Sequence, residues 1–219
     1  MVKELFGKLF RRKLTNQEKD QKEKEWYDFK FRAIESILGK PHDNIMHSLI
    51  SFYAGGALHL HYYPNGIEGT GIVTKELSTL YGTEYGDSPK NNTYDHYELV
   101  MFTKEAIEVG NTFDVKTQYS GAEKNIRSLL NTVARFSFEA TLNPNETCEF
   151  PESFEEIGGK CLIFDSYGDA VGGFGLMLVI EIFRSEMKFA MENSGTALLS
   201  KLKESGYYPY SDMDRDPVV

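Results

Sequence analysis

The sequence predicts an α+β fold in which helices pack on a mixed, largely antiparallel sheet within a single globular domain. Apolar residues alternate over several short segments, as in strands, and recur with a helical period over longer ones. The two kinds of segment follow one another without a regular strand–helix–strand order and without an internal repeat. This irregular order favours the α+β class.

The densest hydrophobic pattern lies between residues 172 and 210. Residues 176–183 are mostly apolar on both alternating faces, so we expect a strand inside a sheet that is covered on both sides. Three glycines that suit a tight turn lie at the start of this strand or just before it: Gly172, Gly173 and Gly175. A phosphate-binding glycine motif would instead follow a strand and open a helix. We therefore interpret these glycines as turn residues.

An amphipathic helix is expected after this strand. Its apolar residues follow a helical period over residues 187–202. Ser185 is the candidate N-cap and Gly206 the candidate C-terminal stop. The same patterns predict further strands at 57–63, 71–77, 94–103 and 161–164, and further helices at 26–38, 42–52 and 122–138.

The chain has a basic beginning and an acidic remainder. Residues 1–30 hold nine Lys/Arg against six Asp/Glu, a net charge of +3, and the whole chain carries −9, which leaves −12 for residues 31–219. We interpret residues 1–25 as a basic, charged helical extension and 26–219 as the globular domain. The apolar face within residues 1–14 fits a membrane-surface helix or, as we prefer, a short helix that docks on the body or frays.

The composition favours a protein partner over nucleic acid. A net charge of −9 disfavours binding to a phosphate backbone, and the acidic remainder matches a basic partner. Two cysteines, Cys148 and Cys161, form neither a CxxC motif nor a disulfide framework. The chain begins without a signal-peptide pattern, and no run reaches the roughly 18 apolar residues of a spanning helix. We expect a cytoplasmic protein without stable membrane insertion.

Four segments resemble the suppressor-of-fused domain family in order and spacing. They are YPNGIEGTGIVTKEL at 63–77, HYELVMFTKE at 96–105, RSLLNTVARFSF at 127–138 and the stretch at 178–215. The match covers roughly residues 50–219, and the chain has the size typical of the bacterial branch. The resemblance implies a structural corner at Asp214 and Arg215 that ties the last segment to neighbouring backbone. The structural-motif positions are Glu98, Glu186, Asp214 and Arg215.

The resemblance also implies a binding module rather than an enzyme. Animal members sequester a transcription factor, and bacterial members are often immunity proteins that neutralise a toxin, commonly a nuclease. We therefore expect a non-enzymatic immunity protein that binds a basic toxin domain and uses no cofactor. The tail is the candidate contact surface, because tyrosine presents a large area and a hydroxyl at low entropic cost. Its candidate residues are Tyr207, Tyr208, Tyr210, Asp212 and Asp216.

Two other functions stay open. The first is a peptide-binding adaptor with a non-toxin client, held by strand addition to an exposed sheet edge. The second is a metal-dependent hydrolase built around His59 and His61, which project from the same face of a predicted strand. His96 or Glu98 could supply a third ligand, but we prefer a polar strand face. We predict no catalytic, cofactor-binding or metal-binding residue.

Overall fold

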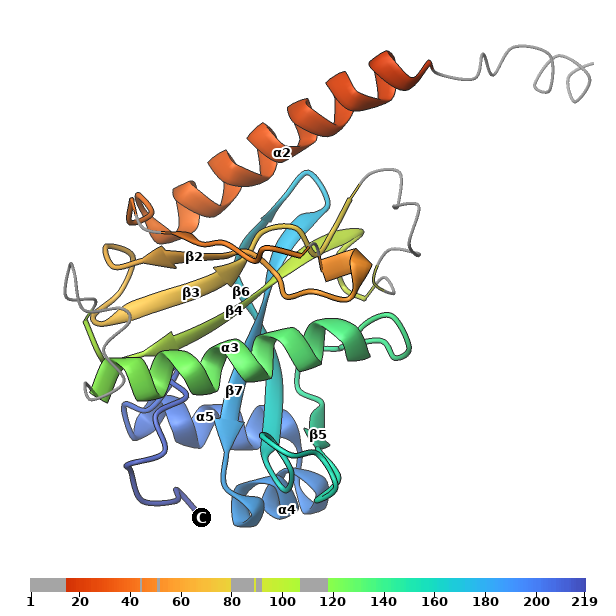
Figure 1. Cartoon of the computed structure of the whole chain (residues 1–219). Helices are drawn as coiled ribbons and strands as arrows, with labels where there is room; N and C mark the ends of the chain where they lie inside the picture. Colours follow the sequence, from red (N-terminus) through yellow and green to blue (C-terminus); the bar gives the residue numbers. More distant parts are fainter. Residues whose placement is uncertain (1–14, 44, 51, 80–88, 90–91, 107–117) are drawn as a thin grey trace, which may run out of the picture.

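The computed structural model describes residues 15–43, 45–50, 52–79, 89, 92–106 and 118–219 (Figure 1). The elements are, in chain order, α2 (Asn16–Leu38), β1 (Ile45–Met46), the 3-10 turn η1 (Phe52–Ala54), β2 (Leu60–Tyr63), β3 (Thr70–Thr74), β4 (His96–Thr103), α3 (Gln118–Phe136), β5 (Thr147–Glu149), β6 (Cys161–Val171), β7 (Phe174–Ile182), α4 (Arg184–Glu192) and α5 (Gly195–Glu204). The expectations for residues 1–14 lie outside the described residues. No helix within the described part is long and apolar enough to cross a membrane.

Seven strands form one sheet in the order β1-β2-β3-β4-β7-β6-β5. Neighbouring strands are antiparallel, except that β4 and β7 run parallel at its centre. Every residue of β7 is buried, as is every residue of β4 after His96. The predicted fold class, an α+β domain with a mixed and largely antiparallel sheet, is thereby confirmed.

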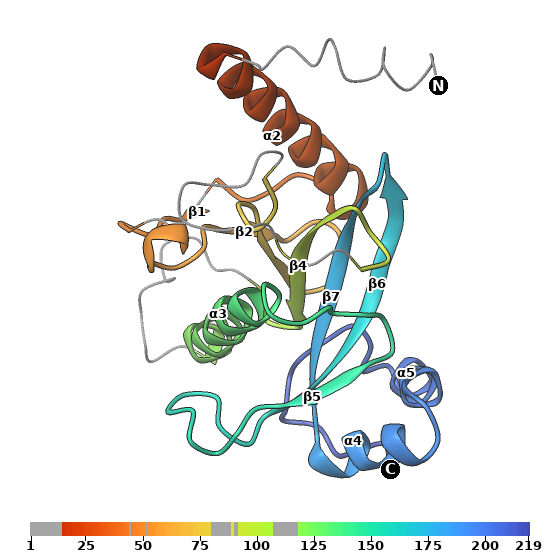
Figure 2. The same ribbon diagram turned by 90° about the vertical axis from the view of Figure 1, so that its right-hand side faces the viewer.

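Helices cover both faces of the sheet (Figure 2). On one face α3 packs Ile126 and its apolar neighbours into a core that includes Met177 and Val179 of β7. On the other face α2, α4 and α5 share a second core with Leu178 and Ile180 of β7. The alternating side chains of β7 therefore fill two cores, as predicted for a strand that is covered on both sides.

Two glycines make the turn between β6 and β7. Gly172 and Gly173 have φ values of 57° and 82°, and Val171 pairs with Phe174 across them. Positive φ at both central positions gives a two-residue hairpin whose twist matches its strands, and glycine adopts it without strain. The prediction of a turn here is confirmed. The strand before it continues to Val171 and is longer than the predicted 161–164.

The segment after β7 forms two helices where the sequence predicts one. Phe183 rather than Ser185 is the N-cap of α4, because the Glu186 carboxylate accepts a hydrogen bond from the Phe183 backbone N–H at 2.9 Å. The predicted N-cap at Ser185 is therefore wrong. Ser194 caps the second helix, α5, by accepting from a backbone N–H. Gly206 follows the end of α5 with a φ of 72°, which confirms the predicted stop.

The beginning of the described chain differs from expectation in one element. Residues 42–52, predicted as a short helix, contain β1 and run into η1. The first helix, α2, starts with a capping box between Thr15 and Glu18 and continues past residue 25 without a break. The division of the chain into an extension at 1–25 and a domain at 26–219 stays a prediction.

Candidate functional site

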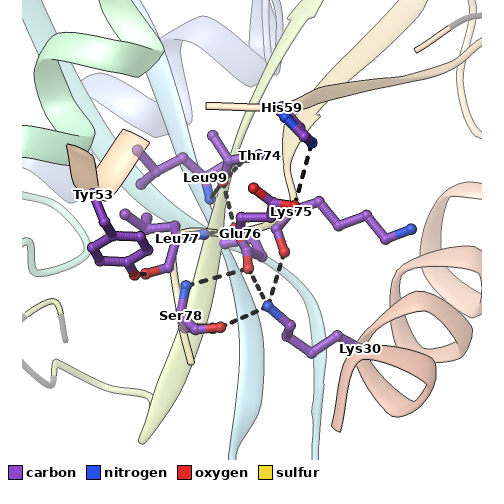
Figure 3. Close-up of polar contacts among 10 residues, drawn as sticks. Lys30, Tyr53, His59, Thr74, Lys75, Glu76, Leu77, Ser78 and Leu99 are labelled. Atoms are coloured by element: carbon purple, nitrogen blue, oxygen red, sulfur yellow. Dashed lines mark hydrogen bonds and ion pairs between the residues drawn. The ribbon is translucent and has the colours of Figure 1, made fainter. Parts of the chain in front are cut away.

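A buried ion pair joins α2 to the centre of the sheet. Lys30 Nζ on α2 lies 2.6 Å from Glu98 Oε1 on β4, and the two side chains are 2% and 0% exposed. Lys30 Nζ also donates to the backbone oxygens of Lys75 at 2.9 Å and Ser78 at 2.7 Å (Figure 3). These three acceptors occupy the three hydrogens of the ammonium group.

The Glu98 carboxylate has partners on both of its oxygens. Oε2 accepts from Thr74 Oγ1 at 2.8 Å and from the Leu77 backbone N–H at 3.0 Å. Oε1 accepts from Lys30 and, more weakly, from the Ser78 backbone N–H at 3.4 Å. Glu98 thus fixes the chain where it leaves β3. The pair acts as a structural clamp, because its donors and acceptors are already engaged within the fold.

Lys30 is the member of this cluster that the sequence analysis missed. It lies three, four and seven positions before Ala33, Ile34 and Ile37, which form part of the apolar face of the same helix. A lysine on the apolar face of a helix needs a buried counter-charge, so this spacing was the available signal. The sequence could not show which carboxylate supplies that charge.

A second buried ion pair ties the C-terminal tail to α4. Arg215 donates to both oxygens of Glu186, at 2.6 and 2.8 Å, and the Val218 backbone N–H donates to the same carboxylate at 3.0 Å. Burial raises the pKa of Glu186, but the hydrogen bonds from Arg215, Val218 and Phe183 outweigh it and hold the pKa below its usual value. Of the two residues of the predicted corner, Arg215 pairs with Glu186 and Asp214 is exposed, so the role of a corner at Asp214 and Arg215 stays a prediction.

The three tail tyrosines pack against the body of the protein. Tyr210 is buried and its hydroxyl donates to the backbone oxygen of Glu68 at 3.0 Å. Tyr208 is half-buried and donates to Asp165 at 3.1 Å, and Tyr207 is half-buried in the same core region. Each ring keeps only part of its area for a partner. Their role in partner binding stays a prediction.

The tail aspartates differ in their surroundings. Asp212 accepts from Thr103 Oγ1 at 2.6 Å and from the Lys104 backbone N–H at 2.8 Å, so it joins the tail to the end of β4. Asp216 is exposed. Asp212 and Asp214 also line a cavity of about 260 Å³. Asp214 and Asp216 are therefore the tail carboxylates that lie open to a partner.

A third buried carboxylate, Glu181 of β7, also lines that cavity. Lys160 Nζ is 2.6 Å from Glu181 Oε1, and Asn125 Nδ2 donates to Oε2 at 2.7 Å. Its backbone N–H donates to Ser211 Oγ. Like Glu98, this carboxylate interrupts an apolar strand and is paired with a lysine, here Lys160 immediately before β6. The Asn125 hydrogen bond joins α3 to β7, and the Lys160 pair joins β7 to the start of the neighbouring strand.

His59 and His61 lie at the start of β2 in different surroundings. His59 Nδ1 is 3.2 Å from Glu76 Oε1 (Figure 3), and its ring contacts His47. His61 is 5% exposed, and burial, helped by the positive charge of Lys75, lowers its pKa to about 3. Among the described residues, no group of three His, Cys, Asp or Glu side chains is placed to hold a metal ion.

Comparison with solved structures finds this fold in the crystal structure of the Sufu–Fu complex. The alignment covers 90% of this chain and 91% of that chain, with a TM-score of 0.60 and 16% sequence identity. Searches against protein-family models and against curated proteins give no match. The chain therefore has a fold like that of a chain in the Sufu–Fu complex, as the sequence resemblance predicts. Its place in the bacterial branch stays a prediction.

Proposed function

We propose that this chain is a non-enzymatic protein-binding module, and that it serves as an immunity protein which occludes a basic toxin domain. The observation that carries the first part is the likeness of fold, over 90% of the chain, to a protein solved in a protein–protein complex. A shared fold does not transfer a partner, so the partner is argued from charge.

The charge supports a basic partner. Residues 31–219 carry a net −12, obtained by subtracting +3 for residues 1–30 from −9 for the whole chain. Exposed acidic side chains include Asp169 in the second half of β6 and Asp216 in the C-terminal tail. Such a surface speeds the capture of a basic protein, as an inhibitor of a nuclease requires.

The polar clusters also support binding over catalysis. Three ion pairs hold their charged groups within the fold, where these charges stabilise contacts between segments of the chain. The pairs are Lys30–Glu98, Arg215–Glu186 and Lys160–Glu181. An acid–base catalyst instead needs a group that can exchange a proton with its substrate.

The test is a complex with the protein encoded by the neighbouring reading frame. We expect the two purified proteins to form a stable 1:1 complex and the neighbour to lose its toxic activity in it. Calorimetry measures the affinity, and a nuclease assay measures the protection. A neighbour that neither binds nor is inhibited contradicts the immunity function.

One feature favours the alternative of a peptide-binding adaptor. β5 pairs only with Cys161, Leu162 and Ile163 of β6, and the outer edge of β6 beyond Phe164 has no strand partner among the described residues. Figure 2 shows this half of β6 at the margin of the sheet. An extended segment could add there by main-chain hydrogen bonds. Recovery of one unrelated client in a pull-down, with no binding to the neighbour, would support the adaptor.

A further inference from the structure

The connection between β2 and β3 contains the single Asn–Gly pair of the chain, Asn65–Gly66. Asn65 is exposed, and the connection consists of bends rather than a regular element. Glycine has no side chain to hinder its backbone nitrogen, and its backbone is more mobile than that of other residues. The pair therefore places a side-chain amide next to an unhindered backbone nitrogen in a loop that water reaches.

The amide groups of this pair are weakly held. Asn65 Nδ2 donates to the Lys40 backbone oxygen at 3.3 Å, which is longer than the roughly 2.7–3.2 Å that is usual. The Gly66 backbone N–H donates to no acceptor among the residues that the structure describes. The exposed Asn193 differs on both counts: it precedes Ser194, and its Nδ2 donates to the Phe189 backbone oxygen at 3.0 Å.

The same connection packs against the C-terminal end of α2 (Figure 1). A β-carbon built at Gly39, the C-cap of α2, would lie 3.4 Å from the β-carbon of Asn65. One built at Gly66 would lie 2.4 Å from the backbone oxygen of Leu38, the fully buried last residue of the helix. The backbone at Gly66 therefore has no room for a further carbon atom on the side that faces α2.

We propose that Asn65 is a site of spontaneous deamidation, and that its products loosen the contact between the β2–β3 connection and α2. The Gly66 nitrogen loses its proton to base and attacks the side-chain amide carbon of Asn65, forming a carbon–nitrogen bond that closes a succinimide ring. The side-chain carbon–nitrogen bond breaks, and its nitrogen takes up a proton and leaves as ammonia. Water then opens the ring at either carbonyl and gives aspartate or isoaspartate, so the conversion consumes only water.

Both products change the contact with α2. Each replaces the amide by a carboxylate, which cannot donate to the Lys40 backbone oxygen. Isoaspartate also carries the main chain through the former side chain, which inserts one methylene group before Gly66. Because Gly66 lies against Leu38, this longer backbone displaces the end of the helix that carries Lys30. The modification therefore acts on the fastening of α2 to the sheet.

The first test follows the conversion in the purified full chain during incubation at mildly alkaline pH, where base removes the amide proton. Mass spectrometry of digests measures deamidation at Asn65 and Asn193 in the same sample, and labelling by an isoaspartyl methyltransferase measures isoaspartate. We expect Asn65 to convert at least about tenfold faster than Asn193, because only Asn65 precedes glycine. Equal rates at the two sites, or conversion of Asn65 only in denaturant, overturns the site.

The second test measures the consequence for α2. The melting temperature of the wild type should fall in step with conversion, whereas Asn65→Gln, which closes the ring far more slowly, should keep its initial value. Freshly purified Asn65→Asp carries the new charge without the extra methylene group. Hydrogen exchange in residues 33–38 should therefore rise more in the isoaspartate form than in Asn65→Asp. Unchanged exchange in the isoaspartate form, or an equal loss in incubated Asn65→Gln, overturns the link to α2.

Discussion

Charged residues at apolar positions fasten this protein together. Glu98 and Glu181 interrupt buried strands; Glu98 pairs with Lys30 of α2, and Glu181 pairs with Lys160 just before β6. A buried pair contributes little net stability compared with apolar residues, but removal of one member leaves an uncompensated charge in the interior. Substitution of one such charged residue is therefore expected to destabilise the fold strongly, although a hydrophobicity pattern alone would not predict a charged residue at these positions.

We predict that Lys30→Met destabilises the protein by about 3–5 kcal/mol, because it leaves Glu98 buried without its counter-charge. Chemical denaturation measures the loss. The double variant Lys30→Met/Glu98→Gln should recover part of it, since the neutral amide still has backbone partners. Lys24→Met, on the exposed side of α2, is the control and should change stability by less than about 0.5 kcal/mol. A loss as small as that for Lys30→Met would contradict the clamp.

The buried His61 makes stability depend on pH. Its pKa is about 3 in the folded protein and about 6.5 in the unfolded chain, so only the unfolded chain takes up a proton between these values. Stability from this group is present above about pH 6.5 and is lost as the pH falls toward 3. Between pH 7 and 5 the loss is up to about 2 kcal/mol.

Thermal unfolding at pH 7 and pH 5 checks this dependence. His61→Leu should remove most of the change between the two pH values, whereas His59→Leu, at a partly exposed neighbour, should keep it. An unchanged pH dependence in His61→Leu would show that other groups cause it.

At the scale of elements, the ends of helices and hairpins are set by backbone geometry. Gly206 ends α5 in the left-handed region, and the next N–H, from Tyr207, donates to the Leu202 backbone oxygen at 2.9 Å. This hydrogen bond turns the chain back toward the body. The tail then follows the sheet to the Glu186–Arg215 pair, so the last element depends on both features.

The glycine at this turn can be tested against one in a helix. Gly206→Ala places a β-carbon in open space but at φ 72°, so we expect a loss of about 1–2 kcal/mol from backbone strain alone. Gly121→Ala, also in open space but within α3, should instead stabilise by about 0.5–1 kcal/mol. Denaturant midpoints of the two variants should therefore shift in opposite directions. A shift of both in the same direction contradicts this account.

The ion pair of the tail gives a second prediction at this scale. Arg215→Met should cost about 3–5 kcal/mol, because Glu186 is fully buried and loses its counter-charge. Hydrogen exchange should rise first in residues 207–219. Arg184→Met removes a pair in which the arginine is 51% exposed, and should cost much less than Arg215→Met because solvent screens the exposed pair. Equal losses in the two variants would argue against burial as the cause.

Charge is the property of the whole molecule that bears on its proposed function. We predict that association with a basic partner slows about tenfold or more as salt rises from about 0.05 to 0.5 M, because screening removes long-range attraction. Stopped-flow mixing with the neighbouring reading frame's product measures this rate. The dissociation rate should change much less. A rate that does not respond to salt would contradict electrostatic capture.

The sequence predicts the interior of this fold better than its connections. β7, α3 and the Gly172–Gly173 turn were predictable because period and glycine position are local signals. The N-cap at Phe183 was not, because it depends on Glu186 reaching back to a backbone N–H. The helix predicted at 42–52 was wrong for a related reason. This segment contains β1, which pairs with β2 at residues 60 and 61, and that partner strand lies outside the segment.

The sequence by itself determined the fold class, the doubly covered central strand and the acidic character, because each depends on residue type and spacing along the chain. The tertiary structure decided the partners: Lys30 for Glu98 and Arg215 for Glu186. The Lys30–Glu98 pair joins residues 68 positions apart in the sequence, and the Arg215–Glu186 pair joins residues 29 positions apart. Such pairing is fixed only when the strands take their order in the sheet, which local sequence does not encode.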